Sequence, residues 1–283
     1  MTDRKISIFF DESGKNSNDI SLMGGVSVPN DYYFCKDIQF LNQQLQRKTF
    51  RMHFTQYDKS DYSNFKMVIQ SFLKLTDAIQ VNIISYKLNN LKDHILYASM
   101  KKDMLYSRLP ERVIYGLLRN YSNMDNLKAD IYIENSNEYA KLHIDKSIKK
   151  QMNIHSLYRY DNFKIENSKL VPKNQEIGIE FTDTILGIIR LIIQNSSLTN
   201  NNQEIKRSLL AKNLLINDLM DELEPLLKSI KIYELTQNDH LKKINFETYL
   251  RFYKANINSF KETNKDDFYD LNNKMLPIKS DQI

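Results

Sequence analysis

The order of the apolar segments predicts an α/β protein in which helices flank a mixed sheet. Two short apolar segments near the N-terminus, residues 5–11 and 20–28, are separated by a polar turn and indicate a β-hairpin. Further strand-like segments then alternate with helical ones, which is typical of a sheet covered by helices. From residue 198 the pattern is helical alone. We therefore expect a domain over residues 1–197 and an all-helical C-terminal extension over residues 198–283.

The first strand is predicted by the run ISIFFDESG, in which apolar residues lead directly into Asp11 and Glu12. A short, nearly uninterrupted apolar run fits a strand that is buried on both faces. Asp11 either begins a turn, as aspartate often does, or is a buried carboxylate that needs a partner or a cation. Neighbouring strand residues point to opposite faces, so Asp11 and Glu12 share a site only if the chain turns at once, which Gly14 permits.

The remaining elements follow from the spacing of apolar residues and from turn residues. The glycine pair at residues 24 and 25 marks a bulge or a close backbone approach in the second strand. Strands are expected at 50–56 (a possible edge strand), 78–88, 129–137 and 157–167. Helices are expected at 31–47, 61–76, 91–121, after residue 137, at 176–194, at 203–230 and at 246–261. Pro110 makes the region 91–121 either two helices or one kinked helix.

Composition sets limits on the class of protein. Lys and Arg number 40 against 35 Asp and Glu, and the net charge of +5 is compatible with a nucleic-acid partner without requiring one. Cys35 is the single cysteine, which excludes an internal disulfide and favours a reducing compartment. The longest apolar run, residues 185–193, is interrupted by Arg190 and is too short to cross a bilayer. With no signal-peptide pattern at the N-terminus, we expect a soluble, cytoplasmic protein without a membrane partner.

Carboxylates occur at the edges of three apolar elements. Asp11 and Glu12 end the first strand, Glu134 ends the segment DIYIE, and a polar stripe runs along the helix at 176–194. The stripe consists of Glu180, Asp183, Thr184, Gly187 and Arg190. It is either the solvent face of an amphipathic helix or a functional acidic face, and Glu134 is either a site residue or a surface acid beside a turn.

Two motifs resemble the bacterial domain-of-unknown-function family 3800, whose fold is similar to ribonuclease H. An N-terminal apolar strand that ends in Asp-Glu-Ser-Gly is the first. The second is IEFTDTILG, which resembles the family's Leu-Gln-hydrophobic-Ala-Asp-hydrophobic-hydrophobic-Ala-Gly. Asp183 falls on its Asp and Gly187 on its Gly, whereas Glu180 replaces Gln and Thr182 replaces Ala.

A third segment, RMHF, resembles a Glu-hydrophobic-His segment of the same family. His53 matches, but Arg51 occupies the acidic position. The resemblance extends over roughly residues 5–195 and does not include the C-terminal extension.

The resemblance implies a ribonuclease H-like nuclease that cleaves DNA or RNA. In such a fold an acid of the helix after the last strand, here the helix at 176–194, joins the acid of the first strand. Clustered carboxylates imply two Mg²⁺ or Mn²⁺ ions. Asp11, Glu134 and Asp183 would be catalytic and metal-binding, with Glu12 and Glu180 as further ligands. The family also indicates a role in phage defence or a mobile element.

Basic residues are the candidates for binding nucleic acid. His53 would contact a phosphate or water, and three lysines after the Glu134 strand would contact phosphates, unless they form an ordinary solvated face. These lysines are Lys146, Lys149 and Lys150.

Two other functions are compatible with the sequence. A non-catalytic interaction protein would keep the fold and use the helical extension to bind a partner subunit or nucleic acid. A hydrolase with a metal-free pair of carboxylates would retain activity in a chelator.

Overall fold

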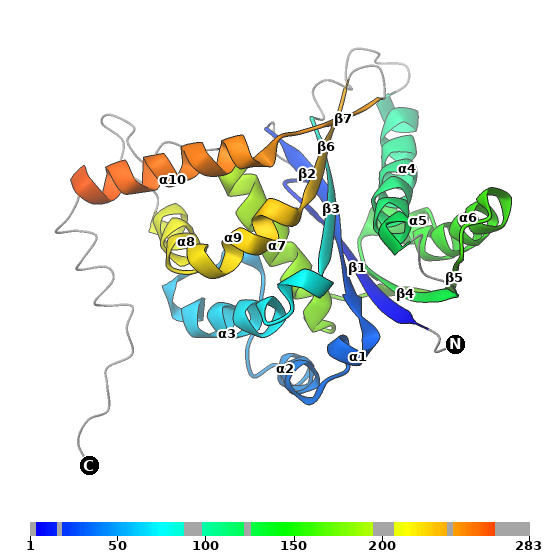
Figure 1. Cartoon of the computed structure of the whole chain (residues 1–283), viewed down its shortest axis with the longest axis horizontal. Coiled ribbons are helices and arrows are strands. Elements are labelled where there is room, and N and C mark those ends of the chain that lie inside the picture. Colours follow the sequence, from blue (N-terminus) through cyan, green and yellow to red (C-terminus); the bar gives the residue numbers. More distant parts are fainter. Residues whose placement is uncertain are drawn as a thin grey trace.

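A mixed β-sheet forms the centre of the protein and confirms the predicted α/β class (Figure 1). The computed structural model describes residues 4–15, 19–87, 98–121, 126–194, 207–236 and 240–263. Within them the strand order is β5-β4-β1-β2-β3-β6-β7. The strands are β1 (Lys5–Ser13), β2 (Ser21–Pro29), β3 (Gln80–Tyr86), β4 (Leu127–Glu134), β5 (Phe163–Val171), β6 (Lys231–Leu235) and β7 (Leu241–Lys243). The pairs β1/β4, β4/β5 and β3/β6 are parallel, and β1/β2, β2/β3 and β6/β7 are antiparallel.

β1 lies in the interior of the sheet and contributes to two hydrophobic cores. Ile6, Ile8 and Phe10 pack on one face, and Phe9 packs on the other. This two-sided burial is the reason for the nearly continuous apolar run, because a strand covered on both faces has no solvent side to make polar.

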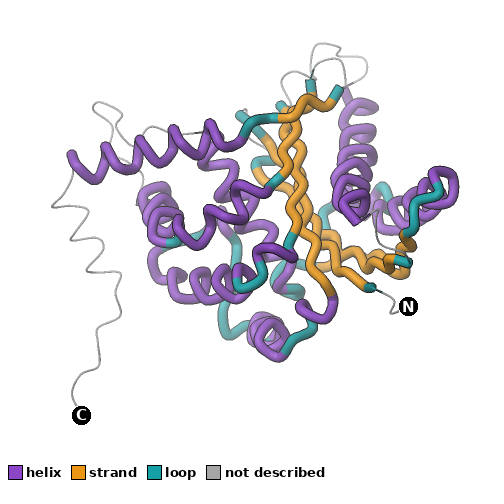
Figure 2. Tube along the Cα trace, viewed as in Figure 1, coloured by secondary structure: helices purple, strands orange, loops and turns teal. Residues whose placement is uncertain are grey.

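Helices cover both faces of the sheet, as the colouring in Figure 2 shows. The helices are α1 (Asn30–Tyr33), α2 (Lys36–Gln46), α3 (Tyr62–Leu73), α4 (Ala98–Leu118), α5 (Asn137–Lys141), α6 (Ile144–Arg159), α7 (Ile177–Gln194), α8 (Arg207–Asp218), α9 (Met220–Ser229) and α10 (Phe246–Thr263). The face that bears Phe10 is covered by α4, α5 and α6, whereas α1–α3 and α7–α10 lie over the face that bears Phe9 (Figure 1).

α7 lies between the sheet and the C-terminal helices. A Cβ atom at Gly178 would lie 2.5 Å from the ring of Phe9, so the start of α7 packs directly against β1. The helix also contacts α10. A helix that is apolar around most of its circumference requires cover of this kind. Among the described helices none is both long and apolar enough to span a membrane.

The expectation of an all-helical C-terminal extension is wrong. β6 pairs with β3 and β7 pairs with β6, so this part of the chain extends the sheet. Its helices α8, α9 and α10 share the core that contains α7. The helix expected over 203–230 is two helices with Leu219 between them, and residues 203–206 lie outside the described part.

Two smaller expectations differ from the structure, and a third is narrowed by it. The segment 50–56 forms an extended stretch and a 3₁₀ turn, η1 (Phe54–Gln56), instead of an edge strand. The strand expected at 157–167 begins only at Phe163, because α6 continues to Arg159. Of the two alternatives at Pro110, two helices or one kinked helix, the first is excluded, because Pro110 lies within the single helix α4. The first residues of the helix expected from residue 91 lie outside the described part.

Candidate functional site

Asp11 and Glu134 lie side by side where the pairing of two neighbouring parallel strands ends. Phe10 of β1 pairs with Ile133 of β4, so the next residue on each strand points to the other face, the face that α7 covers. The two carboxyl groups are joined by a side-chain hydrogen bond. A hydrogen bond between two carboxyl groups requires that one of them holds a proton.

α7 brings two further acids to this face. Glu180 and Asp183 are only 4% and 7% exposed, and Thr184 is fully buried. The interpretation of the stripe as a solvent face is therefore wrong. Both acids act electrostatically on the pair from the strands, because Asp183 raises the pKa of Asp11 and Glu134 raises that of Glu180.

The segment around His53 holds Asp183 in place. His53 Nδ1 donates to Asp183 Oδ2 at 3.0 Å, and the backbone N–H of Phe54 donates to the same oxygen at 2.8 Å. Gly187 makes this approach possible, because a Cβ atom there would lie 2.0 Å from Phe54 Cδ1. The spacing Asp183–Gly187 thus has a physical reason: one turn after the acid, the helix must leave room for the ring that follows His53.

Two residues of the loop after β5 complete the surroundings. Lys173 Nζ lies 3.1 Å from Glu134 Oε1, and the backbone N–H of Asn174 donates to Glu180 Oε1 at 2.5 Å. Asn174 has a positive φ of 57°, a conformation that asparagine tolerates better than most residues. Sequence reasoning missed both residues. The available signal was their place in a short loop that leads directly into the acidic helix.

Burial and like charge keep part of the cluster protonated. Burial raises the pKa of Asp11 well above its usual value, and the charges of Glu134 and Asp183 raise it further, against a hydrogen bond from the Glu12 N–H. Burial raises the pKa of Glu180 to about 8 even though Asn174 donates to it. Removing a carboxylate from water disfavours its charged form unless a compensating charge is close.

Lys173 supplies part of that compensating charge. Its burial lowers the pKa of the ammonium group, but Glu134, Asp11 and Asp183 together outweigh this effect, and the net change is upward. Lys173 is therefore held in its charged form beside the acids.

Several predicted site residues lie elsewhere. β1 continues as a strand to Ser13, so Glu12 points to the opposite face, where it forms an ion pair with Lys15 at 2.9 Å. The lysines predicted to contact nucleic acid lie on α6, which covers that opposite face. Among them, Lys149 donates to the backbone oxygen of Glu166 at 2.5 Å.

A pocket of about 360 Å³ adjoins the four acids. Its lining residues are Arg51, His53, Gln56, Asp61, Lys173 and Asn174. Three of these, His53, Lys173 and Asn174, also contact acids of the cluster. An anionic ligand in this pocket would therefore contact basic side chains that adjoin the carboxylates.

The chemistry of the cluster fits a divalent cation. Its donors are carboxylate oxygens, the ligands that Mg²⁺ and Mn²⁺ prefer, and two of the carboxyl groups share a proton that a cation could replace. Within the described residues, no group of three or more His, Cys, Asp or Glu side chains is already arranged to hold a metal ion. Binding would require Asp183 and Glu180 to exchange some of their present hydrogen bonds for the ion.

No family model and no curated protein matches the chain. The likeness to family 3800 accordingly stays a prediction that depends on the quoted motifs.

Proposed function

We propose that this protein is a divalent-metal-dependent nuclease that cleaves phosphodiester bonds in DNA or RNA on a ribonuclease H-like fold. The main support is the convergence of acids from β1, β4 and α7 beside a pocket with basic walls. These acids are Asp11, Glu134, Glu180 and Asp183. Burying each carboxylate costs free energy, because the charged group loses its contact with water. Acids from distant parts of the sequence therefore seldom share a buried face unless they have a functional role.

In this proposal Asp11, Glu134 and Asp183 hold Mg²⁺ or Mn²⁺, and Glu180 supports them. When bound, such ions make water a better nucleophile and stabilise charge on the leaving oxygen. The chain itself positions the substrate: Arg51 and Lys173 in the adjoining pocket attract the phosphate. His53 keeps Asp183 oriented through its hydrogen bond.

Metal binding can be tested without any substrate. We expect Mn²⁺ to raise the melting temperature of the wild-type protein, because a ligand that binds only the folded state stabilises it. Asp11→Asn and Asp183→Asn should lose this response. Asp37→Asn is the matched control, because Asp37 is an exposed acid at the start of α2 that pairs only weakly with Lys74, at 3.5 Å. An equal response in all four proteins would refute the metal site.

Cleavage is then measured on single- and double-stranded DNA and RNA. We expect wild type and Asp37→Asn to cleave one class of substrate with Mn²⁺ or Mg²⁺, and the two site variants to be inactive although folded. Cleavage that persists in a chelator would instead support a metal-free carboxylate hydrolase. Metal binding without cleavage of any substrate would argue against the nuclease.

A further inference from the structure

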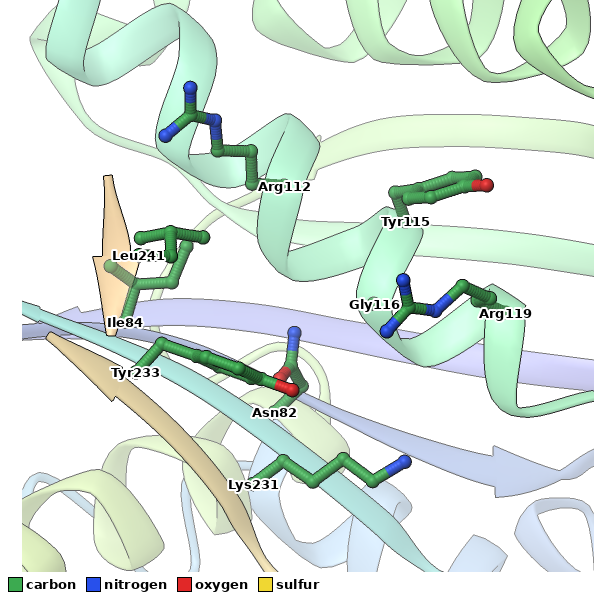
Figure 3. Close-up of a pocket in the computed structure, with 9 residues that line it drawn as sticks. All are labelled: Asn82, Ile84, Arg112, Tyr115, Gly116, Arg119, Lys231, Tyr233 and Leu241. Carbon is green, nitrogen blue, oxygen red and sulfur yellow. The ribbon is translucent and has the colours of Figure 1, made fainter. Parts of the chain in front are cut away.

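A second pocket, of about 270 Å³, lies on the face of the sheet opposite the acids, between α4 and the strands β3, β6 and β7 (Figure 3). Its volume is near the lower end of the range for small-molecule sites, about 300–1,000 Å³. The lining residues are Asn82, Ile84, Arg112, Tyr115, Gly116, Arg119, Lys231, Tyr233 and Leu241. Three of them are basic and none of them is acidic.

The positive charge in this pocket is concentrated around Lys231. Burial lowers the pKa of its ammonium group, and the like charges of Arg119 and Lys243 lower it further. The hydrogen-bond partner of Lys231 Nζ is the neutral amide oxygen of Asn120, which leaves the charge uncompensated by that contact. Cations gathered against one another in a hollow favour an anionic ligand.

The pocket also has an aromatic and apolar side. In Figure 3 the ring of Tyr233 lies across the pocket, with Arg119 and Lys231 near its hydroxyl end and Ile84 and Leu241 near its other end. The ligand that matches this division has an anionic group at one end and a flat, largely apolar ring at the other. The cations would bind the anionic group, and the ring of Tyr233 and the apolar side chains would pack against the flat ring.

A buried amide forms part of the wall. Asn82 Nδ2 donates to the backbone oxygen of Val113 at 2.9 Å, which fixes the orientation of the amide. Gly116 leaves room for it, since a Cβ atom there would lie 2.2 Å from Nδ2. Asn82 Oδ1 is buried and has no hydrogen-bond partner among the described residues. An unsatisfied buried acceptor is unfavourable until a donor reaches it, and an N–H group of a ligand ring would be such a donor.

We propose that this pocket binds a nucleoside monophosphate, with the phosphate at Arg119 and Lys231 and the base against Tyr233. The same chemical group occurs as a free mononucleotide and as the phosphorylated end of a nucleic-acid strand. The proposal is independent of the nuclease activity, because the pocket shares no residue with the acidic site and lies on the other face of the sheet.

Calorimetric titration of the full chain in a chelator tests the site. The probes are adenosine 5′-monophosphate, adenosine, inorganic phosphate and a short 5′-phosphorylated oligonucleotide. We expect the monophosphate to bind more tightly than adenosine or phosphate alone, since each of these makes only half of the contacts. Comparison with the oligonucleotide distinguishes the free nucleotide from the end of a strand.

Variants locate the binding. Lys231→Gln and Arg119→Gln should each lower the affinity for the monophosphate by about tenfold or more, the usual effect of losing a charge-assisted hydrogen bond. Leu241→Glu adds a negative charge at a partly exposed position of the pocket rim and should weaken it further. Lys228→Gln is the matched control, because Lys228 is an exposed lysine of α9 that pairs with Glu224.

The outcomes are distinguishable. Asp11→Asn should bind the monophosphate like wild type, so a failed nuclease proposal would leave this one intact. Phosphate binding as tightly as the monophosphate would overturn the base-binding half of the proposal. Absence of monophosphate binding, or equal binding by wild type and all three pocket variants, would overturn the site.

Discussion

Replacing Glu180 by glutamine should stabilise the protein in a pH-dependent way. The side chain is buried on α7 next to Asp183, and burial raises its pKa to about 8 from an ordinary value of 4.5. Glutamine has the same shape, keeps the oxygen that accepts from the Asn174 N–H, and carries no ionisable proton. The substitution therefore removes the titration while leaving the packing nearly intact.

The sign follows from comparing the folded and unfolded states. Below pH 4.5 Glu180 is protonated in both states and its titration has no effect on stability. As the pH rises, the unfolded chain ionises first, so stability falls until the pH passes the folded pKa of about 8. The full loss is at most about 5 kcal/mol, and between pH 5 and pH 7.5 it is about 3 kcal/mol, from 1.36 kcal/mol for each pKa unit.

Urea unfolding in a chelator at both pH values measures this difference. Relative to wild type, Glu180→Gln should gain about 3 kcal/mol in free energy of unfolding between pH 5 and pH 7.5, or about 5 °C in melting temperature for a chain of this size. Glu234→Gln is the control, because Glu234 is exposed on β6 and should show no such gain. A gain for Glu180→Gln that does not change with pH would refute the reasoning, since only a titrating group links stability to protons.

Three further predictions concern packing. Gly187→Ala places a methyl group against Phe54, so it should destabilise the fold by about 1–3 kcal/mol and lower any cleavage rate. Thermal melting measures the first effect and the nuclease assay measures the second. Unchanged values would contradict the close approach of Phe54 to the helix. Phe72→Ala removes one ring of a stack with Phe181, whose centroids are 4.2 Å apart, and should cost about 3–5 kcal/mol in urea unfolding; a loss below about 1 kcal/mol would contradict it. A chain ending at residue 197 leaves the edge of β3 that faces β6 unpaired and removes α10 from α7, so it should aggregate in size-exclusion chromatography. A folded monomer would support the division predicted from the sequence.

The parts of the site that follow from local pattern could be predicted from the sequence. The apolar run of β1 identified Asp11, and the polar stripe identified Glu180 and Asp183, because strand and helix periodicities are properties of a few neighbouring residues. Lys173 and Asn174 could not be found this way. They belong to a loop without periodicity, and their role depends on where a distant strand ends.

The missed strands have a similar cause. β6 is only five residues long and pairs with β3, which lies about 150 residues earlier in the chain. Nothing within so short a segment separates it from the end of a helix. Glu12 illustrates the reverse case. Alternation along a strand implied that Glu12 and Asp11 point to opposite faces of the sheet if the strand continues, and β1 does continue to Ser13.

The position of α7 has a consequence for the newly made chain. This very apolar helix leaves the ribosome well before α10, one of the helices that cover it. Until residue 260 or so has emerged, one side of α7 is open to water and to other nascent chains. The element that carries Glu180 and Asp183 therefore needs protection during synthesis until the last helix covers it.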